Sequence, residues 1–443
     1  MGMRIRRKPL PTEPVRAMVE SLTHDGRGIV RLDGRPIFVG GALPGEEISF
    51  VLTDMRRDFG EGRAVEIHSP APGRVEPRCP SFGICGGCSF QHVADAEQIR
   101  FKQDALIEQF RRTAKLEGWP LLPPLTGPSW GYRHKARLGV KYVAKKGRVL
   151  VGFRERSSPF IADLRTCPVL HPRVGERLPD LADMIGSLSI RDRLPQIEVA
   201  VGDDRAALVF RILADLTDAD RQCLADFARD FDFEVYTQRH GPDTVTPLYP
   251  DDPPPLSYTL PEQGVRFAFQ PTDFTQVNID INRSMVSRVM ALMDPQPGER
   301  ILDLFCGIGN FTLPLATRGG HVVGVEGGAE AVARALQNAA ANGLMNVECH
   351  VADLTQPLDG QPWAAGGYDK LLLDPSRAGA EEVLAGIPRW QPNRIVYVSC
   401  NPSTLARDAG ILVHEHGYRL LQAGVMDMFP QTAHVESIAL FER

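Results

Sequence analysis

Regular alternation of strand-like and helix-like segments, from residue 266 to residue 443, constrains this chain more than any other feature. Runs of β-branched and aliphatic residues recur there, at 300–304, 321–325 and 394–398 for example, and helical patterns follow them. Strands that alternate with helices form a parallel sheet with both faces covered, which is why such strands are almost wholly apolar. We therefore predict a doubly wound, Rossmann-like α/β domain over residues 266–443.

A glycine-bearing loop follows the first of these runs. Residues Arg300–Phe311 read as a strand, a loop and a helix start, and glycines there let the backbone approach a ligand closely. The third glycine of a dinucleotide site is absent. The next strand ends at Glu326, the usual place for a carboxylate that binds a ribose diol, and Asp353 occupies the position that contacts adenine. Together these features resemble a class I S-adenosylmethionine site.

Two strand ends carry candidate catalytic groups. Cys400 lies where the run 394–398 would surface, and the Asn-Pro turn after it presents the thiol rather than packing it. Asp374, before Pro375, ends another strand; an acid–proline pair there commonly lines the junction of donor and substrate, and an ordinary turn is the alternative. Glu436 opens a later strand-like run. A cysteine nucleophile and a carboxylate base suit methylation of a poorly nucleophilic carbon.

Cysteine spacing predicts a metal site. Cys79, Cys85 and Cys88 share a glycine-rich loop, and Cys167 supplies a fourth thiol from a distant segment. Structural zinc sites usually use two pairs of closely spaced ligands, so three cysteines plus one favour a 4Fe-4S cluster. Zinc and unligated thiols are the alternatives. No signal-peptide core follows the basic N-terminus, which favours metal binding over disulfides.

The chain before residue 266 divides into two further parts. Residues 1–70 hold five short alternating runs separated by turns, which predicts a small β-barrel of the oligonucleotide-binding (OB) type. Turns near Gly26 and Pro44 resemble those of the TRAM domain, an RNA-binding module, with a purely structural barrel as the alternative. Residues 71–265 form a central α+β part that carries the cysteines.

Charge is unevenly distributed along the chain. The formal net charge is −5, yet residues 101–170 contain 14 Lys and Arg against 5 Asp and Glu. A basic surface on an acidic protein is typical of nucleic-acid binding, and a solvated basic face is the alternative. Apolar stretches are too short for a transmembrane helix, so we expect a cytoplasmic protein without a membrane partner.

Across its whole length the chain resembles the RNA uracil-C5 methyltransferases. The motifs that carry this resemblance are the four cysteines, Tyr132–Arg137, Phe269–Asn278, the glycine loop, Asp374–Arg377, Ser399–Pro402 and His434–Glu436. The resemblance implies an S-adenosylmethionine-dependent enzyme with a 4Fe-4S cluster that forms 5-methyluridine in 23S ribosomal RNA. The cysteines and N-terminal barrel together mark the branch that acts on uridine 1939. A flipped uracil base in single-stranded or loop RNA and a monomeric enzyme are also implied.

The resemblance assigns roles to individual residues. Cys400 would attack C6 of uracil, and Glu436 would then remove the proton from C5. The implied donor-binding residues are Gln276, Phe305, Asn310, Glu326, Asp353 and Asp374. The implied cluster ligands are Cys79, Cys85, Cys88 and Cys167. His134 and Asp353 stand where many relatives have Asn, although Asp353 is still a suitable partner for adenine.

Three other functions fit parts of the pattern. An exocyclic-amine methyltransferase needs an acidic-Pro-Pro-aromatic motif, and Ser376-Arg377 stands in its place. A noncatalytic RNA-binding iron–sulfur protein would not need Cys400, Glu436 and an intact glycine loop together. Methylation of a different uridine, in 23S ribosomal RNA or in tRNA, is the third alternative.

Overall fold

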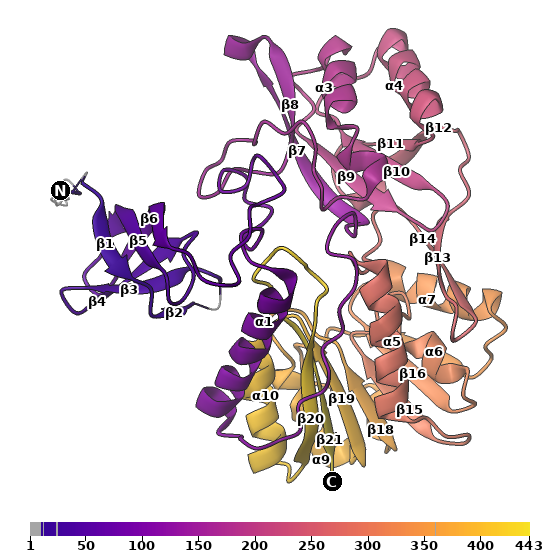
Figure 1. Ribbon diagram of the computed structural model, residues 1–443. Helices are drawn as coiled ribbons and strands as arrows, with labels where there is room; N and C mark the ends of the chain where they lie inside the picture. The colour runs from indigo at the N-terminus through magenta and orange to yellow at the C-terminus, as the bar shows by residue number, and fades with distance from the viewer. Residues whose placement is uncertain (1–9, 12, 24, 359) are drawn as a thin grey trace, which may run out of the picture.

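The structure is a computed structural model that describes residues 10–11, 13–23, 25–358 and 360–443. Its strands form four sheets. In Figure 1 the N-terminal sheet lies at the left in indigo, the central sheet at the top and the C-terminal sheet at the bottom. No helix in the described part of the chain is long and apolar enough to cross a membrane.

The N-terminal sheet has six strands in the order β1-β5-β6-β4-β3-β2. The strands are β1 (Val15–Met18), β2 (Ser21–Leu22), β3 (Gly28–Leu32), β4 (Arg35–Gly40), β5 (Glu47–Met55) and β6 (Gly60–Ser69). Burial alternates along β4 and β5, so that Ile37, Val39, Ile48 and Phe50 meet in one apolar core. The five alternating runs of the sequence are thus strands, and β2 is an addition.

An ion pair and a close packing contact are among the contacts that join this sheet to the rest of the protein. Arg74 forms an ion pair with the buried Glu46, at 2.5 Å between Nε and Oε1. Gly26, in the turn between β2 and β3, has φ +82°, and a Cβ there would lie 2.4 Å from the Phe90 ring and 3.1 Å from Ala433. Only glycine permits both this backbone conformation and this approach. The turn is therefore seated against the C-terminal part of the chain.

The central sheet has the order β12-β11-β10-β9-β7-β8. Its strands are β7 (Lys135–Val143), β8 (Arg148–Gly152), β9 (Gln196–Val201), β10 (Ala206–Arg211), β11 (Glu234–Gln238) and β12 (Val245–Tyr249). The associated helices and helical turns are η2 (Ala144–Lys146), α2 (Pro172–Gly175), α3 (Leu178–Ser187), α4 (Asp218–Phe231) and η3 (Pro242–Thr244). Leu181 of α3 and Leu224 of α4 belong to the same apolar cluster as Val199 of β9, so both helices pack on this sheet.

The C-terminal sheet has seven strands in the order β17-β16-β15-β18-β19-β21-β20. They are β15 (Arg300–Leu304), β16 (His321–Glu326), β17 (Val347–Val351), β18 (Lys370–Leu373), β19 (Arg394–Ser399), β20 (Arg419–Met426) and β21 (Glu436–Glu442). The strands from β17 to β19 in this order run parallel, and β21 is antiparallel to both β19 and β20. The hairpin of β13 (Leu256–Leu260) and β14 (Val265–Phe269) packs with the same core.

Helices cover both faces of the C-terminal sheet. They are α5 (Ile279–Met293), α6 (Thr312–Ala316), α7 (Ala329–Ala341), η4 (Pro362–Ala365), α8 (Glu381–Leu384), α9 (Ile387–Trp390) and α10 (Pro402–His414). Along β15, Ile301 packs in the cluster that contains α5, whereas its neighbour Leu302 packs in the cluster that contains α10. Both faces of the strand are buried, which explains its continuous apolar run. The predicted doubly wound sheet is confirmed.

One helix from the central segment of the sequence belongs to this C-terminal layer. Helix α1 (Asp95–Gln109) continues into the π-helical turn η1 (Phe110–Ala114) and lies beside α10 (Figure 1). Leu106 and Phe110 are fully buried in the cluster that contains Leu405 of α10. The segment that follows the cysteine loop therefore helps to build the C-terminal core.

Candidate active site

The topology of the C-terminal sheet brings the predicted catalytic and donor-binding residues to one edge. Five residues or loops follow the carboxyl ends of parallel strands, in the order Phe305 (β15), Glu326 (β16), Asp353 (β17), Asp374 (β18) and Cys400 (β19). Because β21 is antiparallel, its first residue lies at this same edge. Ser399 pairs with Ser437, so Cys400 and Glu436 are the adjoining residues of neighbouring strands.

The loop after β15 contains a residue with positive φ and a glycine that faces open space. Phe305 has φ +67°, unusual for an aromatic residue, and its N–H donates to the carbonyl of Val325 at 2.8 Å. A Cβ at Gly307 would meet nothing within 4 Å, so open space lies above the loop. The carboxylate of Glu326 accepts a hydrogen bond from Gly307 N–H at 3.2 Å and another from Gly328 N–H at 3.0 Å. Glu326 thereby ties the first two strand ends together.

Asn310 is oriented by residues that the sequence analysis did not identify. Its Oδ1 accepts hydrogen bonds from the Tyr258 hydroxyl at 2.9 Å and from Asn282 Nδ2 at 3.0 Å. Its Nδ2 donates to Asn282 Oδ1 at 2.9 Å. Tyr258 and Asn282 also line a small pocket with Gln276, which places Gln276 beside the glycine loop. These partners come from β13 and α5, and no local sequence signal links them to the loop.

His134 lines that same small pocket. Its Nδ1 lies 2.9 Å from the Tyr132 carbonyl, and the ring packs edge-on against His171 with centroids 4.9 Å apart. Since a carbonyl oxygen only accepts, Nδ1 carries the proton and Nε2 is left as an acceptor. Burial lowers the pKa of His134, which keeps the imidazole neutral. His134 thus offers an acceptor where an Asn side chain would offer an amide.

Asp353 is exposed at the end of β17. Its Oδ1 accepts from the backbone N–H of Thr355 at 3.0 Å and from the Thr355 hydroxyl at 2.7 Å. These hydrogen bonds lower the pKa of Asp353, so the group is a carboxylate. The adjoining Ala352 N–H donates to the carbonyl of Glu326, which fixes the two acids relative to each other.

Asp303 is a further acid at this edge that the sequence analysis did not single out. It is fully buried within β15; Thr312 donates to its Oδ2, and its Oδ1 has no hydrogen-bond partner among the described residues. Burial raises the pKa of Asp303 to about 7. In the sequence, Asp303 is recognisable as an acid inside an apolar run, and this could have marked it as a candidate site residue. A buried carboxylate oxygen without a partner suits a ligand that carries positive charge or N–H donors.

Cys400 lies in a pocket of about 640 Å³ beside Arg377 and His434. Burial and the neighbouring carboxyl groups of Glu436 and Asp374 raise the pKa of its thiol to about 11, whereas the Arg377 guanidinium acts in the opposite direction. Arg377 Nη2 lies 3.4 Å from His434 Nδ1, and its carbonyl accepts from Asn401 Nδ2 at 3.0 Å. Sequence reasoning gave Arg377 no role.

Glu436 is almost completely buried, and the preceding residue Val435 lines this pocket. Burial, reinforced by Asp374, raises the pKa of Glu436 to about 8. Burial and Asp303 together raise the pKa of Asp374 to about 8. Two carboxyl groups with pKa values near neutrality therefore adjoin the thiol. Such groups are poised to accept or hold a proton.

Three parts of the chain line the Cys400 pocket. The N-terminal sheet contributes Asp25, Gly26, Arg27 and Glu61. The cysteine loop and the segment near Arg156 contribute Gly86, Gly87, Cys88, Ser89, Arg156 and Ser157. The remaining lining comes from α1, the loop after β18, the segment that leads into α10 and the loop before β21. The pocket is thus assembled from segments far apart in the sequence.

The four predicted cluster ligands line one small cavity. Its lining includes Cys79, Cys85, Cys88 and Cys167. Burial raises the pKa of Cys88 to about 12 and that of Cys167 to about 11, and the nearby thiols add to both shifts. Within the described part of the chain, no three His, Cys, Asp or Glu side chains are arranged to hold a single metal ion.

Comparison with known proteins decides the family. The model of the family described as tRNA (Uracil-5-)-methyltransferase matches residues 256–443. A 23S rRNA (uracil(1939)-C(5))-methyltransferase RlmD from Methylococcus capsulatus is 61% identical, with all of both chains covered. Another protein of that name, from Alkalilimnicola ehrlichii, is 56% identical over 99% of this chain and 98% of its own. The chain belongs to the RNA uracil-C5 methyltransferases.

A solved structure of the RNA uracil-C5 methyltransferases has the same overall fold. The tRNA (uracil-54, C5)-methyltransferase of Pyrococcus abyssi, in complex with S-adenosyl-L-homocysteine, superimposes with a TM-score of 0.73. It is 26% identical, and the match covers 96% of this chain and all of that one. The predicted family and its S-adenosylmethionine methyltransferase fold are confirmed. The roles of the individual site residues stay predictions.

Proposed function

We propose that this protein transfers a methyl group from S-adenosylmethionine to C5 of a uridine in 23S ribosomal RNA, uridine 1939. Relatives named for that activity share more than half of its residues over nearly the whole chain. The observation that carries the proposal is the pairing of β19 with β21. This pairing sets Cys400 beside Glu436 at the sheet edge where the glycine loop begins.

The chemistry requires a nucleophile because C5 of uracil does not take a methyl group unaided. The Cys400 thiolate adds to C6, and the ring electrons move toward C5 and O4 so that C5 becomes nucleophilic. With a pKa near 11, the free thiol is mostly protonated at neutral pH. We propose that Arg377, whose charge favours the thiolate, promotes its formation when RNA excludes water from the pocket.

After C5 has taken the methyl group, its proton must leave before the sulfur can. Glu436 is the base that we propose for this step, because it is buried beside Cys400 and has a pKa of about 8. Proton transfer to Glu436 restores the double bond between C5 and C6, and the electron pair of the S–C6 bond returns to Cys400. The enzyme is then free for another cycle.

The donor site fits S-adenosylmethionine, which supplies an electrophilic methyl group when bound. Glu326 and Asp353 follow adjacent strands and offer carboxylate oxygens for the ribose and the adenine. The unpartnered oxygen of Asp303 and the open space above Gly307 suit the positively charged end of the molecule. Gln276, Phe305, Asn310 and Asp374 are the further donor-binding residues in this proposal.

The target base must leave its stack to reach Cys400, so we propose that a single-stranded or loop uridine flips into the pocket. Phe274 has 75% of its surface exposed and lies two residues before Gln276, where it could replace a stacking partner. We further propose that the N-terminal sheet is a TRAM-type OB barrel that binds RNA, since its turn lines the same pocket. We also propose a monomeric enzyme that acts in the cytoplasm, where ribosomal RNA is modified.

For the four-cysteine cavity we propose a 4Fe-4S cluster held by Cys79, Cys85, Cys88 and Cys167. The donor set is all thiol, and the four side chains line one cavity. When bound, the cluster would supply a rigid link between residues 79–88 and Cys167. Gly87 N–H already donates to Cys85 Sγ at 3.4 Å, the kind of bond that stabilises a ligating thiolate.

Methyl transfer tests the function directly. Purified protein with radiolabelled S-adenosylmethionine should label a 23S fragment that contains uridine 1939, and mass spectrometry should find 5-methyluridine at that nucleotide. A fragment with cytidine at this position is the matched control and should stay unlabelled. Equal labelling of that control would assign a different uridine, and labelling of tRNA alone would assign tRNA as the substrate.

Anaerobic purification tests the cluster. We expect a brown protein with about four irons and four acid-labile sulfides per chain. Cys167→Ser should lose both, whereas Cys223→Ser, outside the cavity, should lose neither. Stoichiometric zinc without acid-labile sulfide would contradict the proposal.

A further inference from the structure

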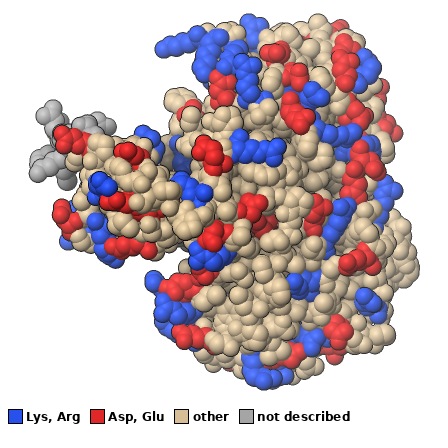
Figure 2. Space-filling view, in the orientation of Figure 1, with Lys and Arg blue, Asp and Glu red and all other residues tan. Residues whose placement is uncertain are grey.

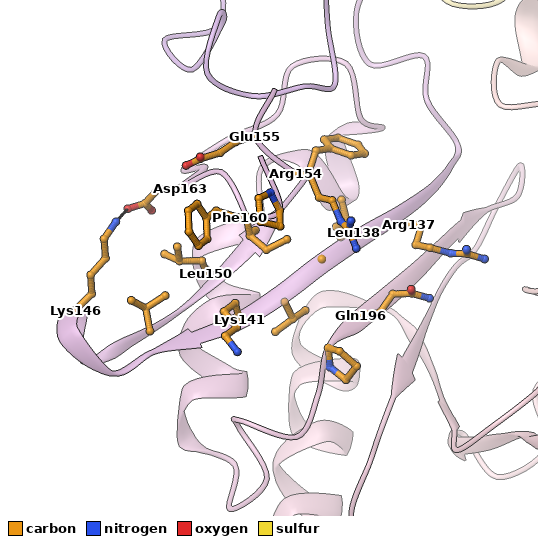
Figure 3. A pocket seen from close by; sticks show the side chains of 17 residues that line it. Arg137, Leu138, Lys141, Lys146, Leu150, Arg154, Glu155, Phe160, Asp163 and Gln196 are labelled. Carbon is orange, nitrogen blue, oxygen red and sulfur yellow. Dashed lines mark hydrogen bonds and ion pairs between the residues drawn. The ribbon is translucent and has the colours of Figure 1, made fainter. Parts of the chain in front are cut away.

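A second pocket, of about 790 Å³, lies on the central sheet beside β7 and β8. Figure 3 shows it between these strands and the loop of residues 153–163, with Phe160 near its middle beside Leu150. The Phe160 side chain has 69% of its surface exposed. We call this pocket the Phe160 groove; Cys400 is not among its lining residues.

Neighbouring residues hold Phe160 in this exposed position. Glu155 N–H donates to the Phe160 carbonyl at 2.9 Å, and Arg154 forms a β-bridge with Ile161. Ile161 packs so closely on β7 that a Cβ at Gly139 would lie 2.3 Å from its Cδ1. The loop is therefore anchored on both sides of Phe160, and the ring is presented without being packed. Because the backbone is already ordered, little conformational entropy is lost when a ligand covers the ring.

The groove is positively charged, and two of its cationic side chains are not used in ion pairs with described residues. Lys146 pairs with Asp163 at 3.1 Å, and Arg137 pairs with Glu198 at 2.8 Å. Lys141 and Arg154, in contrast, make no ion pair with any residue that the structure describes. Figure 2 shows Lys and Arg side chains gathered over this end of the central sheet. An exposed ring flanked by unpaired cations matches the way proteins bind single-stranded nucleic acid, by stacking bases and neutralising phosphates.

One short segment separates the Phe160 groove from the catalytic pocket. Arg154 and Glu155 line the groove, whereas Arg156 and Ser157 line the pocket of Cys400. Hydrogen bonds to the cysteine loop fix this segment, from Gly86 N–H to the Arg154 carbonyl at 2.8 Å and from Arg156 N–H to the Ile84 carbonyl at 2.7 Å. A strand that leaves the catalytic pocket across Arg156 therefore enters the groove.

We propose that the Phe160 groove is a second RNA subsite. A base of the single-stranded segment that flanks the target uridine stacks on Phe160, while Lys141 and Arg154 contact the neighbouring phosphates. This inference rests on the proposed function, because it assigns the groove to the same RNA molecule. It adds that the enzyme distinguishes substrates by the flanking strand as well as by the target base.

The test compares two RNA fragments, a short hairpin that ends near the target uridine and a longer one with its single-stranded flank. We expect the wild-type protein to bind the longer fragment more tightly and Phe160→Ala to lose about tenfold in affinity for it. The loss should be confined to the longer fragment. Met345→Ala is the matched control, because Met345 is 92% exposed and is not a lining residue of the groove.

Charge is tested in the same assay with Lys141→Gln combined with Arg154→Gln. Loss of two phosphate contacts should reduce the slope of log affinity against log salt by about 1.4 for single-stranded RNA. Arg318→Gln, an exposed arginine that does not line the groove, should leave the slope unchanged. Unfolding temperatures of all variants establish that each is folded.

The outcomes separate this inference from the proposed function. If the wild-type protein methylates neither fragment, the proposed function fails. If it methylates both but binds them equally, or if Phe160→Ala retains the preference for the longer fragment, the groove is not an RNA subsite.

Discussion

Ionisable groups are crowded around the end of β19 at a cost to stability. Burial raises the pKa of Glu436, Asp374 and the Cys400 thiol, and a neighbouring carboxyl group adds to each shift, whereas Arg377 opposes the shifts of Glu436 and Cys400. In each case the neutral form is the more stable one in the folded protein. Glu436 and Asp374 therefore deprotonate near pH 8, so each can change its protonation state during a reaction.

Thermal unfolding of the ligand-free protein should reveal this cost. The folded pKa of Glu436 is about 8 against an ordinary value of 4.5, so between these pH values folded Glu436 binds a proton that the unfolded chain has lost. Its contribution to stability is present below pH 4.5 and is lost as pH rises through 8, by up to about 1.4 kcal/mol per pH unit. Glu436→Gln should therefore unfold at a higher temperature than wild type at pH 8, and the gap should close toward pH 5. Glu13→Gln, at an exposed position, is the control; an identical pH dependence in wild type and Glu436→Gln would contradict the raised pKa.

Sequence position predicted some of these residues and not others. Cys400, Glu326 and Asp374 could be found because each directly follows an apolar strand, and parallel strands end at a common edge. Tyr258 and Asn282 could not, since they reach Asn310 from a hairpin and a helix that only the tertiary fold brings near it. Asp303 carried a signal, an acid within an apolar strand, that was not used.

At the level of elements, helix α1 makes tertiary contacts that its local sequence pattern does not reveal. Its helical spacing was visible, but its buried face includes the polar residues Gln98 and Lys102. Gln98 exchanges hydrogen bonds with Gln431, and Lys102 Nζ lies 2.6 Å from Asp427 Oδ1. Both partners belong to the loop before β21, more than 300 residues away, so no sequence pattern could indicate them. Through these bonds α1 holds the loop that leads to Glu436.

Breaking the buried ion pair should therefore lower the stability of the protein. Lys102→Met leaves the Asp427 carboxylate buried without its partner, which should lower the free energy of unfolding by about 3–5 kcal/mol. Lys102→Met with Asp427→Leu should recover much of that loss, because no lone charge remains buried. Lys115→Met changes an exposed lysine near the same helix and serves as the control. Urea denaturation measures all three; equal stability of Lys102→Met and wild type would show that the pair contributes nothing.

At the level of the whole molecule, three parts of the chain meet at one pocket. The predicted boundary at residue 265 falls within the β13–β14 hairpin, and the family model begins at residue 256, the first residue of β13. How the N-terminal sheet is placed could not be predicted, because the approach of Gly26 to Phe90 and Ala433 joins three distant segments.

Removal of residues 1–70 tests the contribution of the N-terminal sheet. Since Asp25, Gly26 and Arg27 line the Cys400 pocket, the truncated protein should bind 23S fragments more weakly and with a smaller salt dependence. Methyl transfer to a short hairpin should survive in part because the catalytic groups remain. Fluorescence anisotropy at several salt concentrations measures both quantities. Unchanged affinity and salt slope would show that the sheet acts only as a spacer.

The most direct test of the account is whether Cys400 and Glu436 divide the reaction as proposed. Cys400→Ala should form no covalent complex with RNA and transfer no methyl group. Glu436→Gln should still attack C6 and methylate C5, then stall, since the C5 proton has no acceptor and Cys400 cannot leave. Intact mass spectrometry of each variant after incubation with donor and 23S fragment is the decisive measurement. We predict a protein–RNA adduct with one added methyl group for Glu436→Gln and none for Cys400→Ala; turnover of Glu436→Gln at the wild-type rate without an adduct would contradict the account.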